Sequence, residues 1–314
     1  MTEVTNEPRK QVDVLVIGAG PGGLSAALYA SRANLSTIIL DKGAPGGEVL
    51  NTSEVENYPG FSLISGPELA EHLFNSATRF GARYEYGDVT HIEPGTGRHT
   101  VYTTQTIYEA KAVIIATGSH HRKLNVPGEK ELSGQGTSYC AVCDGFFFKD
   151  RELIVVGGGD SAVEEGTFLT QFASKVTIVH RRDTLRAQQV LQDRAFNNDK
   201  VDFIWDSTVE KINGENQVES VTIKNLKTGE TYDHPTDGVF IYVGILPNSK
   251  LVEGLDITDE EGWIITDNKM STSIPGIYAV GDVRQTPLRQ IATAVGDGSH
   301  AGHFAYDYIQ TLDN

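Results

Sequence analysis

The chain has 314 residues, enough for two domains of ordinary size, and its 39% hydrophobic content, 33 glycines and 11 prolines are those of a globular protein rather than a disordered or fibrous one. The formal net charge of −16 argues against a nucleic-acid-binding protein, because attraction to phosphates needs a basic face. The longest apolar runs are too short to span a membrane, and the polar N-terminus lacks a signal-peptide core, so we expect a cytoplasmic protein without membrane contact.

The first predicted elements form a nucleotide-binding unit. A buried-type strand at residues 12–17 leads into a glycine-rich turn and a helix at residues 24–32, and a second strand at residues 36–40 ends at Asp41. Such a turn bends sharply and lets a pyrophosphate approach the helix N-terminus, while the acid binds ribose hydroxyls. A glycine-rich turn alone could be purely structural, but strand, helix and acid in register predict a dinucleotide site. Its glycines are Gly18, Gly20 and Gly23.

The same pattern returns in the middle of the chain with a different ending. A strand at residues 152–156, a glycine-rich turn and a helix at residues 163–172 are followed by a strand at residues 175–179. This strand ends at His180, and three arginines follow it: Arg181, Arg182 and Arg186. A carboxylate here would repel the extra phosphate of NADP, whereas guanidinium groups bind phosphate oxygens by paired hydrogen bonds. The cluster therefore favours NADPH over the alternative, a solvated basic patch.

The internal repeat predicts an α/β fold with two nucleotide-binding domains of the Rossmann-like, three-layer ββα type, one inserted in the other. Two short segments, residues 114–118 and 238–244, are expected to cross between the domains. Gly118 and Gly244 are the expected hinge, because glycine tolerates large dihedral changes. The first domain, the inserted domain and the return to the first domain are expected at residues 1–117, 118–245 and 246–314.

Both cysteines lie in one unit, Cys140-Ala-Val-Cys143, followed by Asp144. Two cysteines are too few for a secreted disulfide scaffold, and in the cytosol this spacing indicates redox chemistry. The small disulfide ring can open and close without rebuilding the backbone, and a nearby acid can protonate a leaving thiolate or a reduced flavin. Structural zinc is the main alternative, but a closed site needs four ligands, so we expect no metal. We interpret the adjacent run Phe146–Phe148 as core packing beside the redox loop.

Several motifs resemble, in order and over nearly the whole chain, those of the small bacterial thioredoxin reductases. They are Gly18–Gly23, Glu54–Gly60, Ile115–Gly118, Cys140–Gly145, Gly157–Glu165, His180–Arg186 and Gly281–Val283. The resemblance implies an NADPH-dependent thioredoxin-disulfide reductase that is a homodimer with tightly bound FAD in each subunit. The electrons would pass from NADPH to FAD, then to the Cys140–Cys143 disulfide, then to thioredoxin or a thioredoxin-like protein. The inserted domain, which would bind NADPH, would rotate between the two half-reactions.

By position, the resemblance also assigns individual residues. The FAD site would contain Gly18, Gly20, Gly23, Asp41, Gly46, Gly47, Glu48, Asn57, Thr117, Gly118, Gly281, Asp282, Arg289, Gln290 and Ile291. The NADPH site would contain Gly157, Gly159, Asp160, Ser161, His180, Arg181, Arg182 and Arg186, with the arginines on the 2′-phosphate. Cys143 would face the flavin, Cys140 would be the thiol available for exchange, and Asp144 would be the acid. Glu48 departs from the family's glutamine, and a carboxylate cannot donate a hydrogen bond as an amide does, so this position bears on flavin tuning.

Four other functions compete with this interpretation. A ferredoxin- or flavodoxin-NADP reductase of the same architecture would lack the cysteine pair, and a dithiol oxidase would have no use for the arginines. A hydroperoxide-reductase flavoprotein would carry an extra thioredoxin-like domain at its N-terminus, whereas only about a dozen residues precede the first strand here. A non-catalytic flavin-binding redox sensor would not turn over NADPH.

Overall fold

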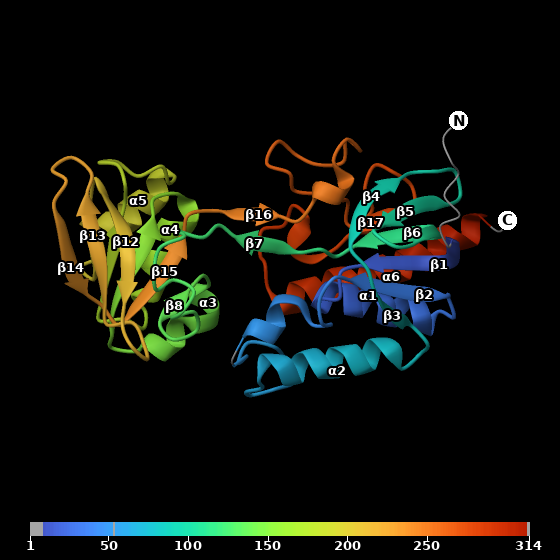
Figure 1. Ribbon diagram of the computed structural model, residues 1–314, viewed down its shortest axis with the longest axis horizontal. Helices are drawn as coiled ribbons and strands as arrows, with labels where there is room; N and C mark the ends of the chain where they lie inside the picture. The colour runs from blue at the N-terminus through green and yellow to red at the C-terminus, as the bar shows by residue number, and fades with distance from the viewer. Residues whose placement is uncertain (1–8, 53, 313–314) are drawn as a thin grey trace. The chain divides into compact units, whose positions relative to one another are not determined.

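The computed structural model describes residues 9–52 and 54–312 and divides the chain into two compact units (Figure 1). The first unit comprises Met1–His120 and Leu246–Asn314, and the second comprises His121–Ile245. The predicted α/β class, with one nucleotide-binding unit inserted in the other, is confirmed. No helix in the described ranges is long and apolar enough to cross a lipid bilayer.

The first unit is built on a seven-stranded sheet in the order β3-β2-β1-β6-β5-β4, with β17 also paired to β6. β4 and β5 are antiparallel additions to an otherwise parallel sheet. β2, the next strand in the chain after β1, lies on one side of β1, and β6 lies on the other side. The strand order therefore reverses direction at β1, and α/β sheets commonly bind ligands at such a switch point. The strands are β1 (Arg9–Ile17), β2 (Thr37–Asp41), β3 (Arg83–Tyr86), β4 (Val89–Glu93), β5 (His99–Thr103), β6 (Ile107–Ile115) and β17 (Ile277–Ala279).

Helices α1 and α6 of the first unit pack closely because glycines face the contact. A Cβ atom on Gly298 would lie 2.1 Å from the Gly22 carbonyl oxygen, and one on Gly302 would lie 2.5 Å from that of Ala26. A Cβ atom on Gly22 would in turn lie 3.2 Å from the carbonyl oxygen of Ala294, so the first turn of α6 lies beside the glycine-rich turn. The helices are α1 (Pro21–Arg32), α2 (Gly66–Thr78) and α6 (Ile291–Leu312), with 3₁₀ turns η1 (Gly47–Asn51), η3 (Lys250–Val252) and η4 (Gly281–Val283).

The second unit has three layers. Leu153 and Val155 of β9 pack against the helices, while Ile154 and Val156 pack against a three-stranded antiparallel sheet. The central sheet is parallel, in the order β11-β10-β9-β15-β8. Its strands are β8 (Thr137–Ser138), β9 (Glu152–Gly157), β10 (Lys175–Val179), β11 (Val201–Ile204) and β15 (Gly238–Tyr242).

The remaining elements of the second unit form its two outer layers. The antiparallel sheet contains β14, a strand that the sequence pattern did not predict. Its strands are β12 (Ser207–Asn213), β13 (Ser220–Asn225) and β14 (Thr231–Pro235). The helices are α3 (Ala141–Asp144), the 3₁₀ turn η2 (Gly145–Phe148), α4 (Asp160–Leu169) and α5 (Gln189–Phe196).

The two crossing segments pair with each other as strands. β7 (Ser119–His121) and β16 (Ile245–Pro247) form a two-stranded ladder, and the backbone N–H of Arg122 donates to the carbonyl of Gly244 at 2.8 Å. Gly118 has φ +68° and Gly244 has φ +125°, conformations that other residues rarely adopt.

Candidate active site

The first glycine-rich turn has the shape of a phosphate cradle. A Cβ atom on Gly18, which has φ +109°, would lie 2.2 Å from the carbonyl oxygen of Ala116, and one on Gly23 would lie 2.0 Å from that of Gly18. Gly20, in contrast, has open space around it and is the N-cap of α1 without a side-chain cap. No side chain therefore caps the first N–H groups of α1, which could bind a phosphate.

Asp41 lies beside this turn at the end of β2. One carboxylate oxygen accepts a hydrogen bond from the backbone N–H of Ala19 at 2.7 Å, and the other accepts from that of Gly43 at 2.8 Å. Two backbone hydrogen bonds thus fix the half-buried carboxylate beside the glycine-rich turn.

The Gly46-Gly47 turn reaches the same cradle. The N–H of Gly46 donates to the carbonyl of Ala19 at 2.8 Å, and a Cβ atom on Gly47 would lie 3.1 Å from the Cα of Gly20. Glu48, the position that departs from the family pattern, is exposed and accepts a hydrogen bond from the Asn51 amide at 3.3 Å.

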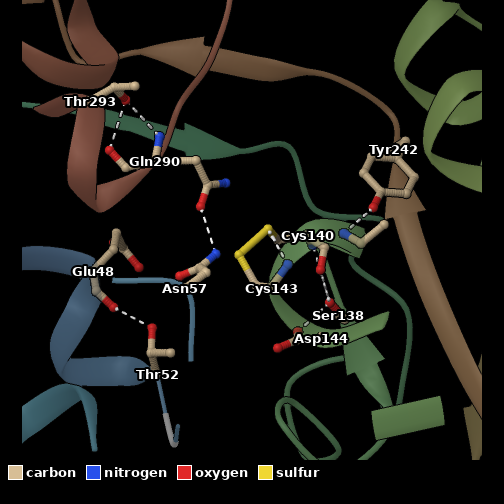
Figure 2. The surroundings of a disulfide bond; sticks show 11 residues. Glu48, Thr52, Asn57, Ser138, Cys140, Cys143, Asp144, Tyr242, Gln290 and Thr293 are labelled. Atoms are coloured by element: carbon tan, nitrogen blue, oxygen red, sulfur yellow. Dashed lines mark hydrogen bonds between the residues drawn. A yellow bond between two sulfur atoms is a disulfide. The ribbon is translucent and has the colours of Figure 1, made fainter. Parts of the chain in front are cut away.

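Three further predicted flavin residues are joined by hydrogen bonds within the first unit. The side-chain amide of Asn57 donates to that of Gln290, just before Ile291 and α6, at 3.0 Å (Figure 2). Thr117, which precedes Gly118, donates its hydroxyl proton to the carbonyl of Asn248 at 2.7 Å, and the Asn248 amide donates back at 2.8 Å. Asn248 was not predicted from the sequence.

A half-buried cation and a half-buried acid also belong to this part of the first unit. The guanidinium of Arg289 stacks on Trp263 at 3.9 Å, and its Nε atom is buried without a hydrogen-bond partner in the described chain. Burial lowers the pKa of Arg289; burial also raises that of Asp282, an effect that Arg289 opposes. Gly281 precedes that acid at φ +67°, and its N–H donates to Asp297 at 3.1 Å. A buried donor left open is satisfied by a polar ligand group, so these residues fit a dinucleotide such as FAD.

The second glycine-rich turn is also closely packed. A Cβ atom on Gly157 would lie 2.5 Å from the carbonyl oxygen of Tyr242, and one on Gly158 would lie 2.2 Å from the ring of His180. Gly159 is the N-cap of α4 without a side-chain cap, so the first N–H groups of this helix also face outward.

Residues in the first turn of α4 brace the cradle. The carboxylate of Asp160 accepts hydrogen bonds from the backbone and side-chain nitrogens of Gln188, at 2.8 and 3.0 Å. Ser161 is exposed beside it, where a ligand at the cradle could reach its hydroxyl.

The basic cluster surrounds a buried neutral histidine at the end of β10. His180 is buried and its Nε2 atom has no partner in the described chain. Burial lowers its pKa, and the neighbouring guanidinium of Arg186 lowers it further. Arg181, Arg182 and Arg186 are exposed, and none forms an ion pair with a described residue. Three guanidinium groups thus remain available to an anion at this strand end.

The redox loop carries a disulfide between Cys140 and Cys143. Cys140 is the N-cap of α3, and its sulfur accepts a hydrogen bond from the backbone N–H of Cys143 at 3.2 Å (Figure 2). Cys143 is exposed and Cys140 is half-buried. The described residues contain no group of three or more histidines, cysteines or acids that could hold a metal ion.

Asp144 is held next to the disulfide by Ser138. The Ser138 hydroxyl donates to the Asp144 carboxylate at 2.5 Å and accepts from the N–H of Cys140 at 3.1 Å (Figure 2). Burial raises the pKa of Asp144, an effect that the Ser138 hydrogen bond opposes. An acid whose pKa lies above its usual value keeps a proton closer to neutral pH, as a proton donor requires.

The interpretation of Phe146–Phe148 as core packing is wrong for its first two residues. Phe146 and Phe147 are 59% and 45% exposed, and only Phe148 packs inward, against Phe240 at 5.3 Å. The run forms the 3₁₀ turn η2, in which successive side chains point about 120° apart, so one short turn cannot bury all three rings.

The sequence analysis also missed Tyr242, which is hydrogen-bonded to the redox loop. The hydroxyl of Tyr242 accepts a hydrogen bond from the N–H of Ala141 at 2.7 Å (Figure 2). The available signal was one hydroxyl-bearing residue in the otherwise apolar strand Val239–Val243, directly before Gly244.

Comparisons with known proteins identify the family of the chain. Residues 12–298 match the pyridine nucleotide-disulphide oxidoreductase family. The thioredoxin reductases of Listeria innocua and Bacillus subtilis are 58% and 57% identical over 304 residues, which cover 96% of this chain and 95% and 96% of theirs. Among solved structures, the Streptococcus pyogenes thioredoxin reductase is 58% identical with a TM-score of 0.92, and the Giardia duodenalis thioredoxin reductase is 37% identical with a TM-score of 0.91. Each comparison covers 96% of this chain and 99% of the other.

Proposed function

The chain belongs to the pyridine nucleotide-disulphide oxidoreductases and, within them, to the thioredoxin reductases, and we propose that it reduces thioredoxin with electrons from NADPH. The observation that carries the proposal is the Cys140–Cys143 disulfide in a chain with two differently built nucleotide cradles. The exchange substrate would be thioredoxin or a thioredoxin-like protein.

The first unit would hold FAD. The glycine-rich turn and the N-terminus of α1 would take the pyrophosphate, and Asp41 would take the ribose hydroxyls. The flavin, when bound, supplies a carrier that accepts two electrons from a nicotinamide and passes them to a disulfide. The open Nε of Arg289 supports a polar part of the cofactor nearby. The remaining assigned residues are Gly46, Gly47, Glu48, Asn57, Thr117, Gly118, Gly281, Asp282, Gln290 and Ile291.

The second unit would hold NADPH. Its cradle, with Gly157, Gly159, Asp160 and Ser161, would bind the pyrophosphate, and the three arginines beside His180 would bind the 2′-phosphate by charge-assisted hydrogen bonds. The absence of an acid at the end of β10 supports this preference, because a carboxylate there would repel the phosphate.

The reduced cysteine pair would then exchange with a protein disulfide. A Cys140 thiolate attacks one sulfur of the thioredoxin disulfide and forms a mixed disulfide, while the other thioredoxin sulfur leaves as a thiolate and takes a proton. The Cys143 thiolate next attacks the sulfur of Cys140. This step re-forms the intramolecular disulfide and releases the second thioredoxin sulfur as a thiolate. The hydrogen bond from the Cys143 N–H supports Cys140 as the first nucleophile, because such a donor stabilises a thiolate. Asp144 would donate the proton that the leaving thioredoxin sulfur takes up.

Rotation of the second unit, a homodimeric state and a cytoplasmic location complete the proposal. The crossing segments form only a short ladder next to Gly118 and Gly244, which supports a hinge there. A reducing compartment suits an enzyme that keeps thiols reduced. Sedimentation of the holoenzyme would test the homodimer.

The decisive experiment measures NADPH oxidation with and without thioredoxin, using wild-type enzyme and the Cys140→Ser and Cys143→Ser variants. We expect both variants to lose thioredoxin reduction while NADPH still reduces the flavin, because the pair accepts electrons after hydride transfer. Equal loss of both half-reactions would remove the cysteines from this role. Turnover with ferredoxin but not thioredoxin, or with oxygen alone, would favour a rival function.

A further inference from the structure

The backbone on the C-terminal side of Cys140 is anchored by a side chain from the central sheet. The Tyr242 hydroxyl accepts the hydrogen bond of the Ala141 N–H at 2.7 Å, and this N–H is the first of α3, which has no partner within its own helix (Figure 2). Tyr242 is the last residue of β15, three residues before the crossing strand β16. The loop is therefore tied to the segment that leaves the second unit.

The backbone on the N-terminal side of Cys140 is anchored to the segment that enters the unit. The ring of Tyr139 stacks on His121 of β7 at 5.3 Å, and the ammonium of Lys123 lies 3.8 Å from the ring centroid. The Tyr139 hydroxyl donates to the carboxylate of Glu129 at 2.7 Å. That carboxylate belongs to a residue only 4% exposed and also accepts two backbone N–H groups just after Lys123, at 3.0 and 2.6 Å.

The environment of Tyr242 keeps its hydroxyl neutral. Burial raises the pKa of Tyr242, and the carboxyl groups of Glu165 and Asp144 raise it further. A neutral phenol retains its proton and still accepts the Ala141 hydrogen bond, so the anchor persists over the physiological pH range.

We propose that Tyr139 and Tyr242 are positioning residues for the redox pair. They hold the backbone on both sides of Cys140, so that after reduction its sulfur stays beside the N–H of Cys143, now as a thiolate that this hydrogen bond stabilises. Opening the disulfide removes the covalent constraint on the loop, and the two tyrosine contacts then maintain the geometry of Cys140. The inference rests on the proposed function only for the role of Cys140 as the exchange thiol.

The test is the pH profile of Cys140 alkylation in the reduced holoenzyme. Iodoacetamide reacts with the thiolate, and mass spectrometry assigns the modified cysteine. In Tyr242→Phe we expect the midpoint of the profile to move to higher pH, and the Cys140 rate at pH 7 to fall about threefold to tenfold, the effect of weakening one hydrogen bond to the thiolate. Tyr139→Phe should show a smaller shift in the same direction, because its ring contacts remain.

Tyr278→Phe is the matched control. This variant also removes a tyrosine hydroxyl, one that donates to the carbonyl of Phe304 at 3.0 Å in the first unit. It therefore loses one hydrogen bond at a place far along the chain from the cysteines. An unchanged profile in Tyr242→Phe, or an equal shift in the control, would overturn the proposal. If Tyr242→Phe fails to retain flavin, the alkylation profile of Tyr139→Phe decides the question: a shift to higher pH supports the proposal, and an unchanged profile overturns it. Alkylation needs no thioredoxin, so failure of the proposed function would appear separately, as wild-type enzyme that does not reduce thioredoxin.

Discussion

The two glycine-rich turns share one backbone plan, and they differ most in chemistry at the residue that follows the second strand. Each has a parallel strand, a glycine-rich turn and a helix whose N-cap, Gly20 or Gly159, offers no side-chain cap. After the second strand, the first cradle has Asp41 bound to the backbone of its own turn, whereas the second has His180 against Gly158 with arginines around it. In the proposed function the shared part would bind a pyrophosphate, and the strand end would distinguish a ribose hydroxyl from an added phosphate.

The largest expected effect comes from filling the turns. In Gly23→Ala the new Cβ atom would lie 2.0 Å from the backbone oxygen of Gly18, so we expect the purified protein to lose most of its flavin. In Gly158→Ala the Cβ atom would meet the His180 ring at 2.2 Å, so NADPH binding should fail while flavin is retained. Flavin absorbance and NADPH titration measure the two outcomes.

Gly296→Ala is the control for this pair, because a Cβ atom there meets open space. If Gly158→Ala lost flavin as readily as Gly23→Ala, the two cradles would not act as separate sites.

The next effect concerns the phosphate that distinguishes the cradles. In the double variant Arg181→Ala/Arg182→Ala we expect the preference for NADPH over NADH to fall roughly tenfold or more for each arginine, since a charged hydrogen bond contributes about 1.5–3 kcal/mol. The ratio of kcat/KM values for the two cofactors is the measurement. The double variant Arg194→Ala/Lys211→Ala removes the same charge from exposed positions elsewhere in the second unit and should leave the ratio unchanged.

The repeat explains how much the sequence could predict. In each unit the strands, the glycines and the strand-end residue lie within about thirty residues of each other, so a local pattern predicted both glycine-rich turns. The disulfide was likewise predicted from two cysteines only three residues apart. Contacts between distant segments did not. Asn248 meets Thr117 across 131 residues, and Tyr242 meets Ala141 across 101, so neither pairing leaves a local signal.

The error at Phe146 and Phe147 has the same origin. Hydrophobic side chains predict burial only if the backbone turns them inward, and a 3₁₀ turn of four residues presents one inward face. Strand β14 was missed because its residues Thr231–Pro235 are mostly exposed and polar.

A smaller effect should follow from neutralising the acid of the first cradle. In Asp41→Asn the carboxylate that accepts the N–H groups of Ala19 and Gly43 becomes an amide with one acceptor oxygen. We expect about tenfold weaker FAD binding, from the loss of roughly one charged hydrogen bond, with unchanged affinity for NADPH. Flavin release followed by fluorescence measures the first quantity.

Asp13→Asn is its control. Asp13 also accepts a backbone N–H, that of Ser36, from the same sheet but outside the turn. Equal weakening of FAD binding in this variant would mean that Asp41 acts through the stability of the sheet rather than through the cofactor.

The smallest expected effect is on the pH dependence of stability, and it comes from one buried histidine in each unit. Burial lowers the pKa of both His99 and His180, and a backbone hydrogen bond opposes the effect in each case, at Pro275 and at Thr184. Only His180 has neighbouring arginines, and these lower its pKa further. Both rings are neutral in the folded protein near pH 7 and take up a proton near pH 6.5 when unfolded. The stability they contribute is therefore fully present above that pH and is lost as the pH falls below about 6.5 towards the folded pKa values.

The loss should be more salt-sensitive in the second unit. We expect the unfolding free energy of both units to fall between pH 7 and pH 5.5, by no more than about 1.3 kcal/mol for each histidine, the limit set by an unfolded pKa of about 6.5. Because the arginines are exposed, about 1 M salt should screen their part, so the pH dependence of the second unit should flatten while that of the first stays the same. Trp263 lies in the first unit and Trp205 in the second, so single-tryptophan variants report each unit in urea titrations. His180→Phe should remove the salt-sensitive part and His99→Phe should not; a salt effect that survives in His180→Phe would assign it to other charges.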